Sequence, residues 1–593
     1  MKQAPLLLPL LAPLAASAVV ERTDACRCRP HEPCWPSQDT WTALNASMDG
    51  VLHAVKPVGT VCHDPNFSDA ACAVVQNMSS DSLWRVQQPG AVQWTNWEAW
   101  TEQNETCYLD LPRQATCKQG RVSLYSAVVE KVEHIQAAVK FAAEHNLRLA
   151  IKNTGHCFLG RSSAPDSLQI STFKMNTTKF VDDFYLTGSS GCKSKKSMGS
   201  AVTLGAGARL QGIYAEAAAH NKSVIIGLSH TVGAAGGYMQ GGGHSPLGPW
   251  KGMAVDNALE FTVVTADGKH VTANSIQNTD LFWALRGGGG GTFGVVTSVT
   301  IRTYPDVPTI FAVFNINDTT NNPTAYWNLV EKFHALLPAV SDAGGSGYYS
   351  VIPKSSANPV GSVNSQLFFV NVTDQAATRK VLDAIKAEGQ KVMPGLDYVF
   401  GPVPHISQAL TQGLTDMGGH SDGLGGIVMT GSRLISRKLL ETKDGPAKLT
   451  KALRDIQEIK DTTGYTGHLV AGGQVARNKH VSSALNPAWR RALTHIVFGR
   501  DWNSTATAEE VIAIRNSMNT IELPILQKLE PDMGAYQNEA DPYEVNFQQS
   551  FWGDNYPRLY AIKQKVDPKN LFIVRSGVGS EHWDDAGLCR VSK

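Results

Sequence analysis

The sequence has almost no excess of charge of either sign and, after its first residues, no long apolar run. Lys and Arg number 53 against 52 Asp and Glu, so no surplus of positive charge is available to neutralise a phosphate backbone or an anionic membrane surface. The apolar stretch 4–16 is shorter than the roughly 20 residues of a spanning helix and is interrupted by Pro9 and Pro13. We therefore expect neither nucleic acid nor a membrane as a partner.

Motifs of several enzyme classes are also missing. Segment 305–527 has no Ser-centred nucleophile elbow, no His-Glu-x-x-His and no Walker glycine loop, which leaves hydrolase and nucleotide-triphosphatase functions without support. The glycine run 287–291 follows a predicted helix and precedes a strand, the reverse of the order in a Rossmann fingerprint, so a nicotinamide site is not supported. The cysteines at 26, 28 and 34 lack the spacing and the histidine pair of a zinc site, and we expect no metal.

What the chain does contain points to secretion. At 593 residues it is long enough for two or three domains. Lys2, the apolar stretch and Ala16-Ser17-Ala18 form the pattern of a signal peptide over 1–18. Nine Asn-x-Ser/Thr sequons, some of which a polar chain of this length contains by chance, and ten cysteines predict an extracellular, disulfide-bonded glycoprotein. Seven cysteines precede residue 120 and predict a disulfide-rich extension over 19–118.

A helix, a strand and a polar loop follow in close order. Apolar residues recur every three or four positions from Val128 to Ala142, which predicts a helix ending near Asn146. Leu147, Leu149 and Ile151 alternate as in a strand whose end delivers 153–156, Asn-Thr-Gly-His, into a loop. We predict further strands at 201–204 and 223–226, a helix at 210–220, a hairpin of 259–265 with 270–273, and a short helix to 286 capped by Asp280.

Six glycines between 233 and 243 are too dense for a regular element. Residues without a side chain let main-chain N–H groups approach phosphate oxygens, so this segment is a candidate pyrophosphate site. The alternative is a flexible surface loop, against which stand the apolar side chains Val232, Tyr238 and Met239 within the same segment. From 305 to 527 the pattern changes to strands at 311–316, 348–352 and 367–372 and a helix at 381–387, which predicts a separate α+β domain.

These segments resemble the berberine-bridge-enzyme-like group of the vanillyl-alcohol oxidase superfamily over about 120–305 and 530–583. Four blocks carry the resemblance: Lys152 to His156, Thr231 to Gly233 with Gly241 to Gly243, Gly290 to Val296, and Phe551 to Leu559 followed by Lys563, Asp567-Pro568 and Leu571-Phe572. The resemblance implies an α+β fold, with a two-part PCMH-type FAD-binding domain (119–304), a substrate domain containing a large antiparallel sheet (305–527) and a C-terminal segment that returns to the FAD domain (528–593).

The resemblance also implies how FAD is held. His156 matches the histidine that bonds covalently to the 8α-methyl of FAD; its alternative is a plain core histidine. The second tether of many members is a cysteine, here replaced by Ser229, so no second cysteinyl bond is expected. Cys157 is expected to pair with another cysteine, such as Cys192. The implied cofactor-binding residues are Lys152, Asn153, Thr154, Gly155, His156, Ser229, Thr231, Val232, Gly233, Gly237, Gly242, Gly243, Gly294, Val296 and Asn538.

The implied activity is oxidation of a small organic substrate by FAD, with O2 as the final acceptor and H2O2 as a product. The small Val232 stands where the family controls oxygen access, although one apparent extra residue before Gly241 departs from many members. Tyr536 is the candidate catalytic base; a free tyrosine has a pKa near ~10 and needs positive charge or hydrogen bonds to act at neutral pH. Ordinary core packing is the alternative role of Tyr536.

We expect a monomer or weak dimer. The rival functions are a flavin-carrying binding protein and a cofactor-free adhesion glycoprotein.

Overall fold

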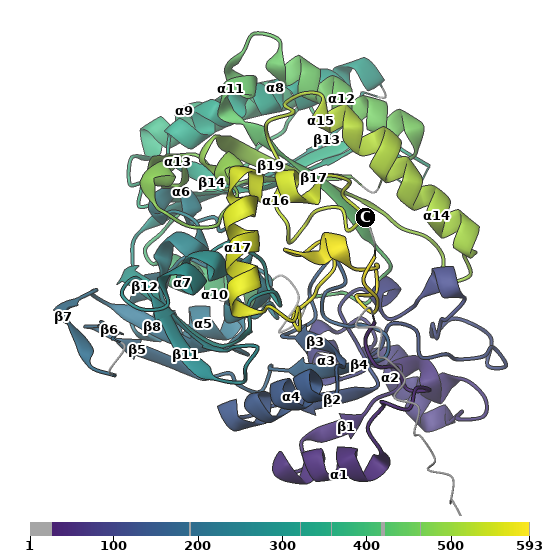
Figure 1. Cartoon of the computed structure of the whole chain (residues 1–593). Helices are drawn as coiled ribbons and strands as arrows, with labels where there is room; N and C mark the ends of the chain where they lie inside the picture. The colour runs from purple at the N-terminus through teal and green to yellow at the C-terminus, as the bar shows by residue number, and fades with distance from the viewer. Residues whose placement is uncertain are drawn as a thin grey trace, which may run out of the picture.

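The computed structural model describes residues 26–188, 191–320, 322–356, 358–416, 422–462 and 464–591, without the side chains of 412–416 (Figure 1). The predicted signal peptide lies outside these residues. Among the helices in these ranges, none combines the length and apolarity that crossing a membrane requires. The described chain contains three main sheets, and the predicted α+β class is confirmed.

The first sheet carries the loop that ends in His156. Its order is β1-β2-β4-β3, with β2, β4 and β3 parallel and β1 antiparallel to β2. The predicted helix is α4, which buries Ile135, Val139 and Ala142 against this sheet; Val128 belongs to β2 instead. The elements are β1 (Leu52–Ala54), β2 (Tyr125–Val128), α4 (Val132–Glu144), β3 (Arg148–Lys152) and β4 (Ser167–Ser171).

The second sheet has the order β11-β10-β12-β8-β5, with β9 paired to β12. The predicted hairpin is present as β10 and β11. The predicted cap by Asp280 is wrong: α7 begins one residue earlier, and the Asp280 carboxylate faces Arg558 at 3.4 Å. The elements are β5 (Thr178–Val181), β6 (Tyr185–Thr187), β7 (Lys193–Ser197), β8 (Ala201–Gly205), α5 (Leu210–Ala219), β9 (Lys222–Val224), η4 (Ala234–Tyr238), α6 (Gly248–Lys251), β10 (Ala258–Val264), β11 (His270–Asn274), α7 (Thr279–Leu285) and β12 (Val295–Pro305).

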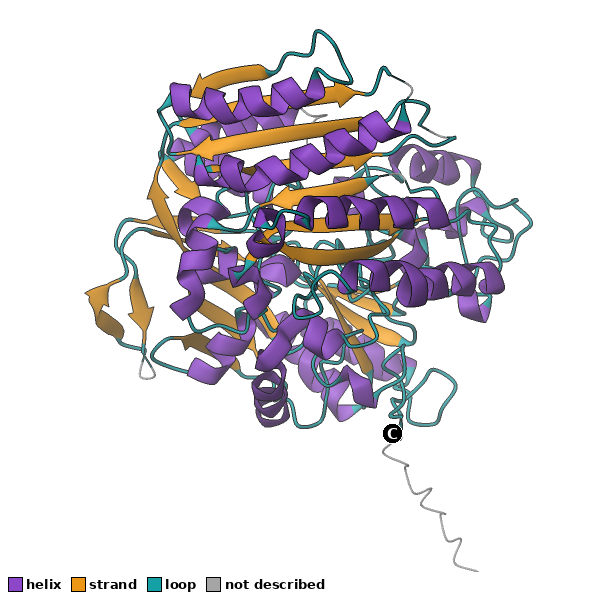
Figure 2. Cartoon of the chain, turned by 90° about the horizontal axis from the view of Figure 1, so that it is seen from above, coloured by secondary structure: helices purple, strands orange, loops and turns teal. Residues whose placement is uncertain are grey.

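The third sheet is the predicted large antiparallel sheet, with seven strands in the order β16-β13-β15-β14-β18-β19-β17. Long helices cover one face, as Figure 2 shows, and share a core with it. The other face shares a core with the second sheet through Phe368, Val370 and Leu434. The elements are β13 (Thr309–Asn317), α8 (Pro323–Asp342), β14 (Gly345–Ile352), β15 (Ser362–Val370), α9 (Gln375–Gly389), β16 (Val399–Val403), α10 (Ile406–Asp416), β17 (Met429–Ser436), α11 (Arg437–Glu441), α12 (Gly445–Ile459), β18 (Tyr465–Leu469), α13 (Gly473–Arg477), β19 (Ala492–Arg500), α14 (Ala508–Ser517) and α15 (Leu523–Gln527).

The C-terminal segment returns to the second sheet. Here α17 packs beside α7 (Figure 1), and the buried Lys563 Nζ donates to the backbone oxygen of Thr292 at 2.8 Å and to Asp567 at 2.6 Å. The hydrogen bond to Thr292 ties the segment to the glycine-rich loop before β12. The remaining helices are α1 (Gln38–Ser47), α2 (Asp69–Met78), α3 (Ser82–Gln87), α16 (Phe547–Trp552) and α17 (Tyr556–Val566).

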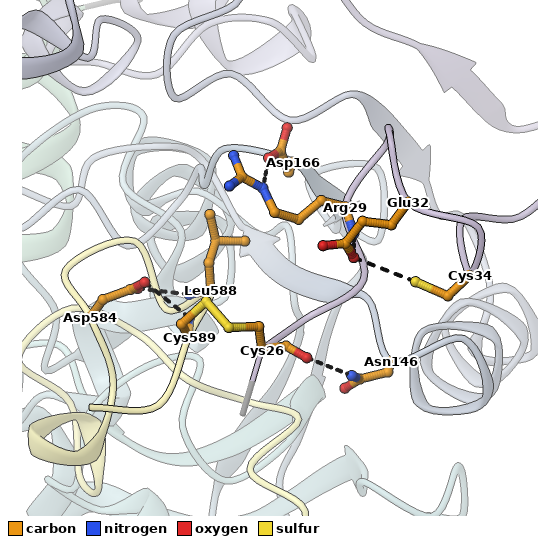
Figure 3. Close-up of a disulfide and its surroundings, with 9 residues drawn as sticks. All are labelled: Cys26, Arg29, Glu32, Cys34, Asn146, Asp166, Asp584, Leu588 and Cys589. Atoms are coloured by element: carbon orange, nitrogen blue, oxygen red, sulfur yellow. Dashed lines mark hydrogen bonds and ion pairs between the residues drawn. A yellow bond between two sulfur atoms is a disulfide. The ribbon is translucent and has the colours of Figure 1, made fainter. Parts of the chain in front are cut away.

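Four disulfides connect Cys26 to Cys589, Cys28 to Cys34, Cys62 to Cys72 and Cys107 to Cys117. All seven cysteines of the extension are therefore bonded. The first bridge joins positions 563 residues apart and ties the extension to the C-terminal segment (Figure 3). The expected pairing of Cys157 with Cys192 is wrong, because both thiols are free. Cys157 lies instead in the wall of the cavity described next.

Candidate flavin site

A cavity of about 410 Å³ lies where the loop after β3 meets the glycine-rich segments and the chain around Tyr536. Its size is that of a small-molecule site. Twelve predicted residues line it: Asn153, Thr154, Gly155, His156, Ser229, Val232, Gly233, Gly237, Gly294, Val296, Tyr536 and Asn538. The sequence motifs, which are spread over almost 400 positions, therefore converge on one cavity.

Four predicted residues do not line the cavity. The Lys152 side chain is buried and its Nζ donates to the backbone oxygens of Arg85 and Gln88, at 3.2 and 2.6 Å. Thr231 contacts His156 from behind the wall. The left-handed backbone at Gly242 and Gly243 forms a turn in which an added Cβ would meet neighbouring side chains. These residues support the cavity from outside.

His156 is held in place on two sides. Its Nε2 lies 2.7 Å from Thr231 Oγ1, and its backbone oxygen accepts a hydrogen bond from Trp94 Nε1 at 3.2 Å. Burial lowers the pKa of His156 to about 4, against the opposing effect of the Asp422 carboxylate. The imidazole is therefore neutral at physiological pH and keeps a lone pair available for bonding.

Asp422 organises the segment that contains Ser229. Its carboxylate accepts a hydrogen bond from Ser229 Oγ at 2.7 Å and lies 2.7 Å from Nδ1 of His230. Burial acts to raise the pKa of Asp422, but the hydrogen bonds from His230 and Ser229 outweigh it and hold the pKa below its usual value. The Asp422 carboxylate thus fixes the Ser229 hydroxyl at the cavity wall.

The glycines leave room that side chains would fill. A Cβ on Gly233 would lie 1.7 Å from Asn153 Oδ1, and one on Gly290 would lie 2.8 Å from the Cα of Gly237. A Cβ on Gly237 meets nothing within 4 Å, so its backbone borders open space. In the described chain, Asn153 Oδ1 and Gln240 Oε1 are buried without a hydrogen-bond partner, and both residues line the cavity. Free acceptors and exposed backbone fit FAD, which carries amide, amine and hydroxyl donors.

Tyr536 also lines the cavity and is almost fully buried. Its hydroxyl accepts a hydrogen bond from Asn538 Nδ2 at 2.7 Å. Burial, and next the charge of Glu539, raise the pKa of Tyr536 above its usual value, and the Asn538 bond offsets this only in part. The phenol is therefore protonated at neutral pH, which differs from the condition that a tyrosine base requires.

Several cavity residues were missed by the sequence reasoning. Trp94 comes from the extension, Asp422 from the segment before β17, and Glu539 follows the Tyr536 motif directly. Phe158 and Arg161 follow His156 within five positions. Glu539, Phe158 and Arg161 lie next to a predicted motif in the sequence. Trp94 and Asp422 have no such local signal, because their positions at the cavity depend on long-range packing.

Comparison with known proteins agrees with this geometry. The family described as "FAD binding domain" matches residues 124–274, and the family described as "Berberine and berberine like" matches 535–579. An uncharacterized FAD-linked oxidoreductase of Arthroderma benhamiae is 50% identical over 594 residues, covering 100% of both chains. The FAD-linked oxidoreductase malF of Malbranchea aurantiaca is 40% identical over 572 residues, covering 96% of this chain and 94% of the relative.

Among solved structures, a VAO-type flavoprotein from Myceliophthora thermophila C1 has a TM-score of 0.85 and 32% sequence identity, covering 96% of this chain and 100% of that one. The similarity thus includes the extension and the large sheet as well as the cavity. The chain belongs to the berberine-bridge-enzyme-like group of the vanillyl-alcohol oxidase superfamily and is an FAD-dependent oxidoreductase.

Proposed function

We propose that the protein is a secreted oxidase that holds FAD by one covalent bond to His156 and reduces O2 to H2O2. The observation that carries this proposal is the neutral His156 imidazole in the wall of a glycine-lined cavity. FAD, when bound, would accept the two electrons and the hydrogen that leave the substrate carbon; that hydrogen and the proton that leaves the substrate oxygen balance the two hydrogens of H2O2. The Ser229 hydroxyl cannot form a thioether, which supports a single bond.

The cavity residues divide into two roles. Asn153, Gln240 and the backbone around Gly237 bind the cofactor, since they offer free acceptors and unobstructed backbone. Tyr536 faces a small organic substrate. Because its phenol stays protonated, we change its proposed role from a base to a hydrogen-bond donor that orients the substrate oxygen.

Val232 lines the cavity and is the residue that we propose admits O2. Its side chain ends at two methyl groups and leaves space that a larger residue would occupy. This property favours an oxidase over a dehydrogenase.

The domain boundaries given above, secretion, glycosylation and a monomeric or weakly dimeric state are part of the same proposal. Four disulfides support an oxidising compartment. The nine sequon asparagines support glycosylation because none of them is buried: Asn45, Asn66, Asn77, Asn104, Asn176, Asn221, Asn317, Asn371 and Asn503.

The test uses the flavin itself and needs no known substrate. The purified protein is photoreduced without oxygen and mixed with aerated buffer, and the return of the flavin absorbance is followed by stopped flow. We expect rapid reoxidation with formation of H2O2, and slower reoxidation in Val232→Phe. A reduced flavin that persists in aerated buffer would exclude the oxidase. A panel of alcohols, phenols, sugars and alkaloids scored by peroxide release then identifies the substrate class.

A further inference from the structure

Three histidines and one carboxylate form a buried cluster beside the cavity. His468 on β18 and His495 on β19 are directly paired across the two strands. His244 follows the glycine-rich segment, and Glu539 belongs to the cavity wall. The three histidines are all at most 8% exposed. Four separate chain segments thus bring four groups with lone pairs to one point.

The distances between the donor atoms match those around a small divalent cation. Glu539 Oε1 lies 3.0 Å from His244 Nε2, and Glu539 Oε2 lies 3.3 Å from His468 Nδ1. His468 Nδ1 and His495 Nδ1 are 3.3 Å apart. Four ligands at the 2.0–2.1 Å typical of zinc sit at tetrahedral corners about 3.3 Å apart.

Hydrogen bonds alone leave the cluster incompletely paired. Glu539 Oε2 is buried without a hydrogen-bond partner in the described chain, and unpaired buried polar atoms are costly. The facing Nδ1 atoms of His468 and His495 share at most one proton, and a proton that lies between them is not donated to Glu539 Oε2. A cation at the centre would accept lone pairs from the imidazoles and the carboxylate together.

We propose that His244, His468 and Glu539 bind a zinc-type divalent cation. His495, with its Nδ1 3.6 Å from Glu539 Oε2, lies within reach as a fourth donor. Imidazole and carboxylate ligands suit zinc, and three protein ligands with an open position are typical of a reactive rather than a structural site.

The position of this site gives it a role in the cavity. Glu539 lines the cavity, and the His244 ring contacts Tyr536 edge-on with centroids 5.3 Å apart. Tyr348 Oη lies 3.5 Å from the other ring nitrogen of His244, where it helps to orient the ring. A cation here would be a Lewis acid for a substrate oxygen held near Tyr536. The expectation that no metal is bound came only from the cysteine spacing near the N-terminus, which carries no information about these residues.

The test measures zinc content, so its result does not depend on oxidase activity. The purified holoprotein is incubated with ZnCl2, desalted and analysed by mass spectrometry for zinc per chain. We expect about one equivalent in the wild type and only the buffer background in Glu539→Gln and in His468→Asn. His480→Gln, a change at an exposed histidine outside the cluster, should retain the wild-type amount. Equal zinc in the wild type and in a folded Glu539→Gln variant would overturn the proposal.

A second measurement covers the case in which the variants do not fold, as judged by flavin absorbance. The wild-type holoprotein is stripped with a soluble chelator, desalted and titrated with ZnCl2. We expect zinc to return to the same content and to raise the unfolding temperature, because an ion that binds only the folded state stabilises it. No retained zinc and no change in unfolding temperature would refute the site.

Discussion

The two walls of the cavity are assembled in different ways. The cofactor wall consists of short contiguous segments, 153–156, 232–237 and 290–296, whose glycines and small side chains let a ligand approach the backbone. The second wall consists of Tyr536 and Glu539, and the histidines of β18 and β19 contact Glu539. The first wall is local in sequence, whereas the second exists only after the sheets have packed.

This difference separates what each wall does. The cofactor wall depends on the absence of side chains, so its chemistry is that of main-chain groups and one neutral imidazole. The second wall depends on buried ionisable groups, whose pKa values are set by burial and by each other. We therefore expect substitutions in the first wall to alter flavin attachment and substitutions in the second to alter turnover and pH dependence.

The largest expected effect is that of His156→Ala. Without the imidazole, no covalent bond to the 8α-methyl can form, and all flavin should be released when the protein is denatured in acid. The readout is the flavin absorbance of the pellet and the supernatant after precipitation. Covalent flavin that persists in this variant would show that another residue forms the bond.

Tyr536→Phe should lower turnover by about 10²-fold while the flavin content stays unchanged, because one donor to the substrate oxygen is lost. Steady-state peroxide release measures the effect. Tyr543→Phe is the matched control, since Tyr543 is close in sequence but is not among the cavity-lining residues. If the two variants have equal turnover, Tyr536 has no role in the reaction.

Asp541→Asn tests the electrostatics of a buried carboxyl two residues beyond Glu539 of the second wall. Asp541 is fully buried, its Oδ2 lacks a hydrogen-bond partner, and burial raises its pKa to about 7. Between pH 4 and 7 the folded state holds a proton that the unfolded state has lost, so this group destabilises the protein increasingly as the pH rises through that window. Above pH 7 the burial of the charged Asp541 lowers the free energy of unfolding by an amount on the order of 4 kcal/mol.

The Asp541→Asn variant should therefore unfold at a higher temperature than the wild type at pH 8, with a smaller difference at pH 5. Thermal unfolding at the two pH values, followed by tryptophan fluorescence, measures this. Asp39→Asn, at an exposed position on α1, is the control and should show no such dependence. The same difference at both pH values would contradict the raised pKa.

The smallest expected effect is that of Cys157→Ser. This free thiol lies in the cofactor wall beside His156, but the proposed tether uses the histidine alone. Covalent flavin and turnover should match those of the wild type. A loss of covalent flavin in this variant would assign the thiol a part in attachment.

The sequence predicted the features that depend on neighbouring residues. The apolar period of α4, the alternation in β3 and the turn between β10 and β11 are local patterns, and they placed His156 at a strand end. The prediction for Asp280 failed because the same residue type that caps a helix also serves in its first turn.

Features that depend on distant residues could not be predicted in this way. The partner of Cys26 lies 563 positions away, and Cys157 has no partner at all although an even cysteine count suggested one. Asp422 contacts Ser229 across 193 positions, and His468 meets His495 through the pairing of β18 with β19. One sequence contains no measure of such contacts, so Asp422, Glu539 and these histidines were missed although Tyr536 was predicted.

The most direct test of the single attachment through His156 is mass spectrometry of the wild-type protein after acid precipitation and trypsin digestion. Cleavage after Lys152 and Arg161 gives peptide 153–161, which contains both His156 and Cys157. We predict that this peptide carries the mass of one flavin, that fragment ions place it on His156, and that the peptide containing Ser229 is unmodified. An unmodified peptide 153–161, or a flavin located on Cys157, would contradict the account.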